Sequence, residues 1–130
     1  MRYENGFVAA IVCVFLAACS AATEPDSGRT FIIEVSGERF RVRTSDDAVI
    51  TQLEMRRREG VVGVVAGDLV AGDGGFNDGW SWHLDPANIR VPDAAIELCD
   101  GRPSMVEDDL TYWLETVESF CPWGAKVVGR

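Results

Sequence analysis

The sequence predicts an α+β fold, a single small domain built on an antiparallel sheet of about five or six strands with two helices and one disulfide. Three observations support this prediction. The chain has 130 residues, which suffices for one hydrophobic core but not for two of ordinary size. Several short stretches alternate apolar and polar residues, as half-buried strands do. Two longer stretches carry apolar residues at helical spacing next to capping signals.

The domain is expected to open with a β-hairpin. Residues 31–35 and 39–43 alternate or nearly so, and Ser36-Gly37-Glu38 between them is a turn signal. Three arginines lie on one face of the second strand, at positions 39, 41 and 43. Such a row is more typical of a solvated sheet face than of an anion site.

A helix and a strand should follow. We expect Ser45 to cap a helix that has acidic residues in its first turn, Arg56 to Arg58 in its last, and Gly60 as its stop. The charges suit the helix dipole, so the three arginines already have a structural explanation. Residues 61–70 are rich in valine and predict a buried strand with a bulge at Gly63 or Gly67.

The stretch from Gly79 to Pro86 is the centre of the predicted fold. It follows the glycine-rich loop 71–78 and holds the only histidine of the chain. As a strand, it places Trp80, Trp82 and Leu84 on one face and Ser81, His83 and Asp85 on the other. The first face is expected to join the core, and the second is the candidate site.

The last third of the sequence predicts four further elements, three strands and a helix. Residues 87–92 predict a turn and a short strand, and residues 94–100 another strand. Ser104 and Glu107 form a capping-box pattern at the start of a helix. That helix would bury five residues on one face, namely Val106, Leu110, Trp113, Leu114 and Val117. Residues 121–124 end it, and residues 125–128 form the final strand.

The N-terminal segment predicts export. Residues 7–16 form an apolar run of signal-peptide length, shorter than a membrane-spanning helix needs. The run ends in Leu16-Ala17-Ala18-Cys19, which resembles a bacterial lipobox. We therefore expect a signal peptide over residues 1–18, acylation (palmitate) of Cys19, a flexible tether over residues 19–29 and the domain over residues 30–130.

Ser20 after the cysteine favours the outer membrane of a bacterial cell envelope, by resemblance to the sorting rule of such lipoproteins. The alternative is plain secretion into the periplasm or beyond, with cleavage near Ala18. The partner expected from the lipobox is the membrane itself, through lipidated Cys19.

Charge and cysteine content bear on the partners, the disulfide and the metal sites that the domain could have. A net charge of −9 argues against a nucleic acid partner, which would need clustered basic residues. Of four cysteines, Cys13 leaves with the signal and Cys19 is acylated, so Cys99 and Cys121 are expected to pair in an oxidising compartment. No cofactor or metal site is predicted, because the loop's acidic residues lack EF-hand spacing, although a calcium site of another kind stays open.

Four blocks of the sequence carry a family resemblance. They are residues 77–86 (NDGWSWHLDP), 95–100 (AIELCD), 106–108 (VED) and 121–123 (CPW). In this order they resemble the calmodulin-binding-protein N-terminal domain family, whose founding member is called binding protein seventy-four. The resemblance covers roughly residues 31–128. It implies a small α+β module found alone or attached to other domains, and it implies no established chemistry.

Three interpretations of His83 follow. In the first it is structural, bonded to Glu97 or Glu107 so that strand and helix are linked. In the second, the domain binds an envelope protein or a glycan without catalysis and acts as a monomer. In the third, His83 serves a hydrolase-like or metal-dependent enzyme with nearby carboxylates, although no nucleophile pattern supports this. The candidate binding or structural residues are Trp80, Ser81, Trp82, His83, Asp85, Glu97, Asp100, Glu107 and Trp123.

Overall fold

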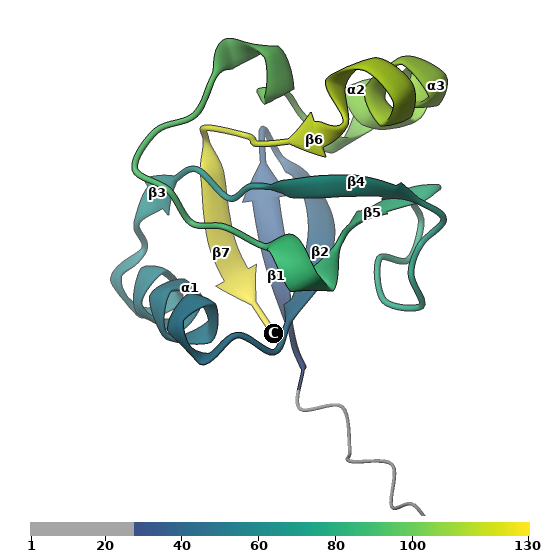
Figure 1. Cartoon of the computed structure of the whole chain (residues 1–130). Coiled ribbons are helices and arrows are strands. Elements are labelled where there is room, and N and C mark those ends of the chain that lie inside the picture. Colours follow the sequence, from purple (N-terminus) through teal and green to yellow (C-terminus); the bar gives the residue numbers. More distant parts are fainter. Residues whose placement is uncertain (1–27) are drawn as a thin grey trace, which may run out of the picture.

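The computed structural model describes residues 28–130. Within them, seven short strands form two antiparallel sheets, and three α-helices join them (Figure 1). The predictions of an α+β class, a single small domain, antiparallel pairing and one disulfide are confirmed. The predicted single sheet is in fact two, of four and three strands, because the chain changes direction within residues 61–70.

The four-stranded sheet has the order β2-β1-β7-β3. Its hairpin consists of β1 (Arg29–Val35) and β2 (Glu38–Thr44), paired along their whole length around a two-residue turn. The last strand, β7 (Ala125–Gly129), pairs with β1, and the short β3 (Val62–Gly63) pairs with β7. The predicted hairpin and final strand are therefore confirmed.

The three-stranded sheet has the order β5-β4-β6. It comprises β4 (Gly67–Ala71), β5 (Trp82–Leu84) and β6 (Ser119–Phe120). Figure 1 shows β4 running across the strands of the larger sheet. An aromatic cluster fills the space between the sheets: Trp82 has its ring centroid 5.6 Å from that of Phe40 and 5.4 Å from that of Phe120. All three rings are buried, and such contacts add specific geometry to the hydrophobic burial.

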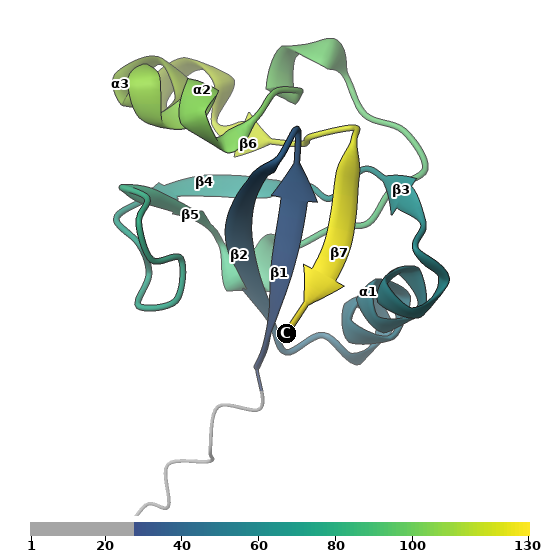
Figure 2. The ribbon, with the colours of Figure 1, turned by 180° about the vertical axis from the view of Figure 1, so that it is seen from behind.

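Helix α1 (Asp47–Glu59) begins and ends as its sequence requires. The side chain of Asp46, not the expected Ser45, caps it by accepting from the backbone N–H groups of Ala48 and Val49. Gly60 ends it with φ of 66°, a left-handed conformation that glycine adopts without strain. The helix buries Ile50 and Leu53 and lies on the same side of the four-stranded sheet as the smaller sheet. Figure 2 shows that no helix of the described residues covers the opposite face.

The second predicted helix is interrupted. Helix α2 (Pro103–Asp108) ends at Asp109, which has φ of −137°, and α3 (Leu110–Tyr112) continues into one π-helical turn over Trp113–Val117. The predicted capping box is wrong. The Ser104 N–H and hydroxyl donate to Glu38, and Glu107 accepts from Ser81 instead. Both carboxylates thereby attach the helix to other elements rather than to its own first turn.

Two predicted strands are also wrong. Residues 87–92 contain part of a 3-10 turn, Pro86–Asn88, and contribute only one isolated bridge, from Arg90 to Ala66. Residues 94–100 form no strand, and their only regular structure is a 3-10 turn at Glu97–Cys99. No strand of the described residues pairs with this segment, and its Ile96 and Leu98 are exposed, whereas Cys99 is buried.

Candidate functional site

The alternation predicted around His83 is present. Trp82 and Leu84 are fully buried in the core, whereas Ser81 is exposed and His83 and Asp85 are half-buried on the other side. Trp80 precedes the strand, and its indole N–H donates to the backbone carbonyl of Arg39 at 2.9 Å. The aromatic residues of this stretch therefore hold the two sheets together, as expected of a core face.

His83 is bonded to the preceding loop rather than to a carboxylate. Its Nδ1 lies 2.7 Å from the carbonyl oxygen of Gly72, and because a carbonyl only accepts, Nδ1 carries the proton. The ring stands edge-on to Phe76, with centroids 5.4 Å apart. The prediction that His83 bonds to Glu97 or Glu107 is wrong. Both oxygens of Glu107 accept from Ser81, one from its N–H at 2.9 Å and one from its hydroxyl at 2.7 Å.

Two of the remaining candidate carboxylates, Asp85 and Asp100, have structural partners, whereas Glu97 is exposed at the start of the 3-10 turn Glu97–Cys99. Asp85 accepts hydrogen bonds from the N–H of Ala87 and from the side chain of Asn88, and in this way it caps the 3-10 turn Pro86–Asn88. Asp100 accepts from the N–H groups of Gly101 and Trp123, both at 2.9 Å. Within residues 28–130 no hydrogen bond or ion pair joins these groups to His83, and no cluster of three or more His, Cys, Asp or Glu could hold a metal ion.

The glycine-rich loop before this strand is attached to the domain by its two buried residues, Phe76 and Asn77, whereas the rest of the loop is exposed. Asn77 is fully buried: its Oδ1 accepts from the Arg41 N–H at 2.7 Å, and its Nδ2 donates to the Trp82 carbonyl at 2.8 Å. Its amide thus bridges edge strand β2 to edge strand β5. Gly74 has φ of 66°, and a Cβ there would lie 2.8 Å from the His83 ring. The loop therefore has a structural role, which its composition did not indicate.

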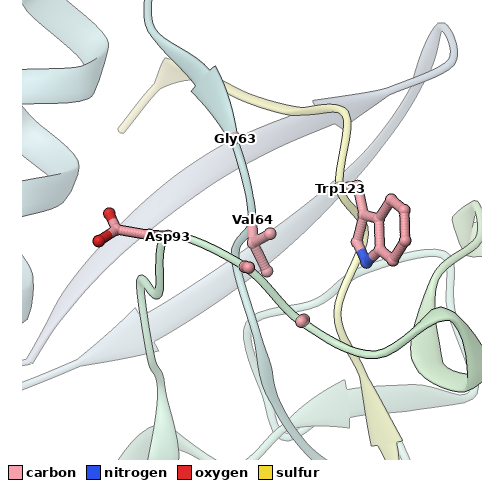
Figure 3. Close-up of a pocket in the computed structure, with 6 residues that line it drawn as sticks. Gly63, Val64, Asp93 and Trp123 are labelled. Carbon is pink, nitrogen blue, oxygen red and sulfur yellow. The ribbon is translucent and has the colours of Figure 1, made fainter.

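The structure places a shallow pocket elsewhere, beside Trp123. It has a volume of about 220 Å³ and a mostly apolar lining formed by Gly63, Val64, Asp93, Ala94, Ala95 and Trp123. Figure 3 shows the Trp123 indole and the Val64 side chain bordering it, with the Asp93 carboxylate pointing away from the indole. Trp123 is 40% exposed, although its family block is otherwise buried at Cys121 and Pro122.

Three large apolar residues that are close in sequence to pocket-lining residues are also exposed. Val62, next to pocket residue Gly63, is 59% exposed, and Ile96 and Leu98, which follow Ala95, are 67% and 55% exposed. We call Val62, Ile96, Leu98 and Trp123 the apolar rim. Trp123 was a candidate from the sequence, whereas Ile96 and Leu98 were missed because residues 94–100 were predicted to form a strand.

The one charged residue that lines the pocket, Asp93, interacts with a nearby arginine. Arg56 of α1 reaches back to donate from Nη1 to the Val64 carbonyl at 2.7 Å. Burial lowers the pKa of the Arg56 guanidinium, and the negative charge of Asp93 opposes that shift. Because Asp93 is matched in this way by Arg56, the pocket offers indole, valine and alanine surface with little uncompensated charge.

The disulfide fixes two segments of this surface together. Cys99 and Cys121 are bonded, as predicted, with their Cα atoms 5.0 Å apart and both side chains buried. The Cys121 N–H also donates to the Cys99 carbonyl at 2.7 Å. Leu98 and Trp123 therefore lie on two segments of chain that a covalent bond and a backbone hydrogen bond hold side by side.

The residues on which the export prediction rests precede the described part of the chain, residues 28–130. The signal peptide, the Leu16–Cys19 lipobox and Cys19 itself lie outside the described residues. Among residues 28–130, no helix combines the length and hydropathy that a membrane span needs.

Comparison with known proteins assigns the chain to a family. The family model of the N-terminal domain of binding protein seventy-four matches residues 27–130, a range that includes the whole described domain. No curated protein and no solved structure matches the chain significantly. The matched range includes all four blocks noted above, and the match confirms the resemblance that they carry. The chain therefore belongs to the binding protein seventy-four N-terminal domain family.

Proposed function

We propose that this protein is a lipid-anchored component of a bacterial cell envelope whose domain binds another envelope protein without catalysing a reaction. Family membership suggests a small binding domain. The anchor is supported by the match of Leu16–Cys19 to all four lipobox positions, directly after an apolar run. Acylation of Cys19 would hold the chain on the membrane, and Ser20 favours the outer membrane.

The observation that carries the binding role is the exposed Trp123 beside the pocket, together with the other apolar rim residues on chain segments that line or follow it. Large exposed side chains are ordinary when scattered, but a group of them on neighbouring segments is typical of an interaction surface. The pocket, at about 220 Å³, is smaller than most small-molecule sites, which begin near about 300 Å³. It suits one apolar side chain of a partner protein, with Trp123 as the anchoring aromatic.

A protein partner fits this surface better than a glycan. Sugar rings need hydrogen-bonding groups beside an aromatic platform, whereas the other three rim residues, Val62, Ile96 and Leu98, are aliphatic. Asp93, the one charged residue of the lining, points away from the indole and interacts with Arg56 (Figure 3). Burial of aliphatic surface is therefore the main stabilising contribution that this site offers.

The polar candidates around His83 do not pair a nucleophile with this histidine. A hydrolase that uses His83 as its general base would need a nucleophile within hydrogen-bond reach of the imidazole ring. The Ser81 hydroxyl donates to Glu107, and His83 donates to the Gly72 carbonyl, so the two groups serve separate structural contacts.

Site-specific photocrosslinking in intact cells tests this proposal. A photoreactive phenylalanine analogue would replace Trp123 in the full chain, and in a control chain it would replace Tyr112, which is 42% exposed but outside the rim. We expect a discrete adduct from position 123 and not from position 112. The double substitution I96D and L98D should abolish that adduct, because it places carboxylates on the rim.

The opposite results would refute the binding role. A folded, exported chain without an adduct at position 123 would do so, and so would an adduct that the two aspartates leave unchanged.

A further inference from the structure

A second hollow lies at the end of the domain where the tether begins. It has a volume of about 290 Å³, and four arginines line it: Arg29, Arg57, Arg58 and Arg130. Arg29 is the first residue of β1, Arg57 and Arg58 are in the last turn of α1, and Arg130 follows β7. Figures 1 and 2 both show the start of β1 and the end of β7 meeting at this end of the molecule.

One carboxylate organises these arginines. The oxygens of Glu54 lie 2.6 Å from a guanidinium nitrogen of Arg130, 3.1 Å from one of Arg57 and 3.9 Å from one of Arg29. Arg130, more than any other group, keeps the pKa of Glu54 below its usual value, so the carboxylate stays charged at neutral pH. A single negative charge positions three guanidinium groups but does not neutralise four, and no ion pair to Arg58 exists among residues 28–130.

The arginines remain open to an external anion. The side chains of Arg29 and Arg130 are 56% and 57% exposed, and that of Arg57 is 34% exposed. Arginine presents a planar set of donors that matches the oxygens of a phosphate group, often through two hydrogen bonds at once. The hollow therefore has the charge and the donors for a phosphate, in a chain whose net charge is −9.

We propose that this arginine hollow binds the phosphates of anionic phospholipid headgroups and thereby docks the domain on the membrane that anchors it. The inference rests on the proposed lipid anchor. Arg29 lies ten positions after Cys19, so a flexible tether would hold the hollow on average about 17 Å from the acylated cysteine. At that distance the membrane surface is present at a high effective concentration.

The charge distribution would also orient the domain on the membrane. An anionic membrane surface repels the acidic chain as a whole and attracts the arginine hollow, so the end of the domain that carries the tether would face the membrane. Strand β7 runs from the Trp123 end of the domain to this hollow (Figure 1). Docking through the arginines would therefore turn the apolar rim away from the membrane and toward a partner.

Fluorescence quenching on the acylated full chain tests the docking. Thr51, which lines the hollow and is exposed, would be replaced by cysteine and labelled with bimane. The protein would be reconstituted in vesicles of phosphatidylcholine with about 30% phosphatidylglycerol, or in vesicles without it, both containing headgroup-spin-labelled lipid. We expect quenching about twofold stronger with phosphatidylglycerol, lost in R57Q/R58Q and largely lost in about 0.5 M salt. The double variant R39Q/R41Q, which removes the same charge from strand β2, should keep it.

Each other result has a defined meaning. Equal quenching in both vesicles, or equal loss in both double variants, would overturn the docking. A bimane response to inorganic phosphate without any effect of phosphatidylglycerol would assign the hollow to a soluble anion and also overturn it. The mass of the reconstituted protein is checked first: absence of acylation refutes the anchor, whereas an acylated protein without docking refutes this inference alone.

Discussion

Replacing Asn77 by alanine should destabilise the domain by several kcal/mol. The substitution removes the acceptor of the Arg41 N–H and the donor to the Trp82 carbonyl, at a position that is fully buried. Each of the two buried backbone groups left without a partner costs about 1–3 kcal/mol, so the loss should be about 2–6 kcal/mol. Because the amide joins β2 to β5, the loss affects contact between the two sheets and not only the loop.

Urea unfolding followed by tryptophan fluorescence measures this effect. With an m-value of about 1.5 kcal/mol/M, a loss of about 3 kcal/mol lowers the midpoint by about 2 M. Asp78→Ala is the matched control, since Asp78 is the exposed neighbour and should change stability by less than about 0.5 kcal/mol. If Asn77→Ala unfolds within about 0.5 kcal/mol of the parent at an unchanged m-value, the bridging role assigned to Asn77 is refuted.

Three further predictions concern the disulfide, an ion pair and the histidine. Reduction of the Cys99–Cys121 bond, which spans 22 positions, should lower stability by about 3 kcal/mol by thermal unfolding; an unchanged melting temperature with two titratable thiols would contradict this. Arg130 lowers the pKa of Glu54, so the stability that this ion pair contributes is fully present above the usual glutamate pKa and is lost as pH falls through the lowered pKa. The difference in melting temperature between the parent and Glu54→Gln should therefore vanish in acid. A difference that stays constant with pH would contradict the contribution of this ion pair. His83→Ala should cost about 1 kcal/mol in urea unfolding through the lost bond to the Gly72 carbonyl, and a gain in stability would contradict its structural role.

Much of the fold was predictable because local signals and tertiary packing agree. Alternation located the β1–β2 hairpin, and charges with Gly60 located α1. Only the cap residue was misplaced, since Ser45 and Asp46 are both good caps and sequence alone does not rank them. Residues 61–70 predict one strand because valine favours strands, whereas the chain crosses from one sheet to the other within them.

The candidate site was harder to predict for a physical reason. Polar residues on one strand face suggest a site, but here each of them is used for a structural contact, and some of these contacts depend on distant segments. Glu107, for example, lies 26 positions from Ser81, and Asn77 lies 36 positions from Arg41. Ile96 and Leu98 of the apolar rim were missed because a stretch such as Ala95–Cys99 has the pattern of a buried strand unless its neighbours are known.

The arginine hollow illustrates the same limit. The row Arg56 to Arg58 was predicted as a favourable helix end, and that explanation holds. Arg29 and Arg130 lie close together because β1 and β7 are antiparallel neighbours, and α1, which contacts β7, brings Arg57 and Arg58 to the same hollow. Charge clusters formed by topology leave no signature in a single segment of sequence.

The most direct test of the account is the intact mass of the full chain expressed in a bacterium and purified from its membrane fraction. We predict a protein that lacks residues 1–18 and carries acyl chains on Cys19, with a gain of about 2 daltons when the Cys99–Cys121 bond is reduced. A chain that retains residues 1–18, or one that begins near Cys19 without acylation, would contradict the lipid anchor on which the proposed place of this domain depends.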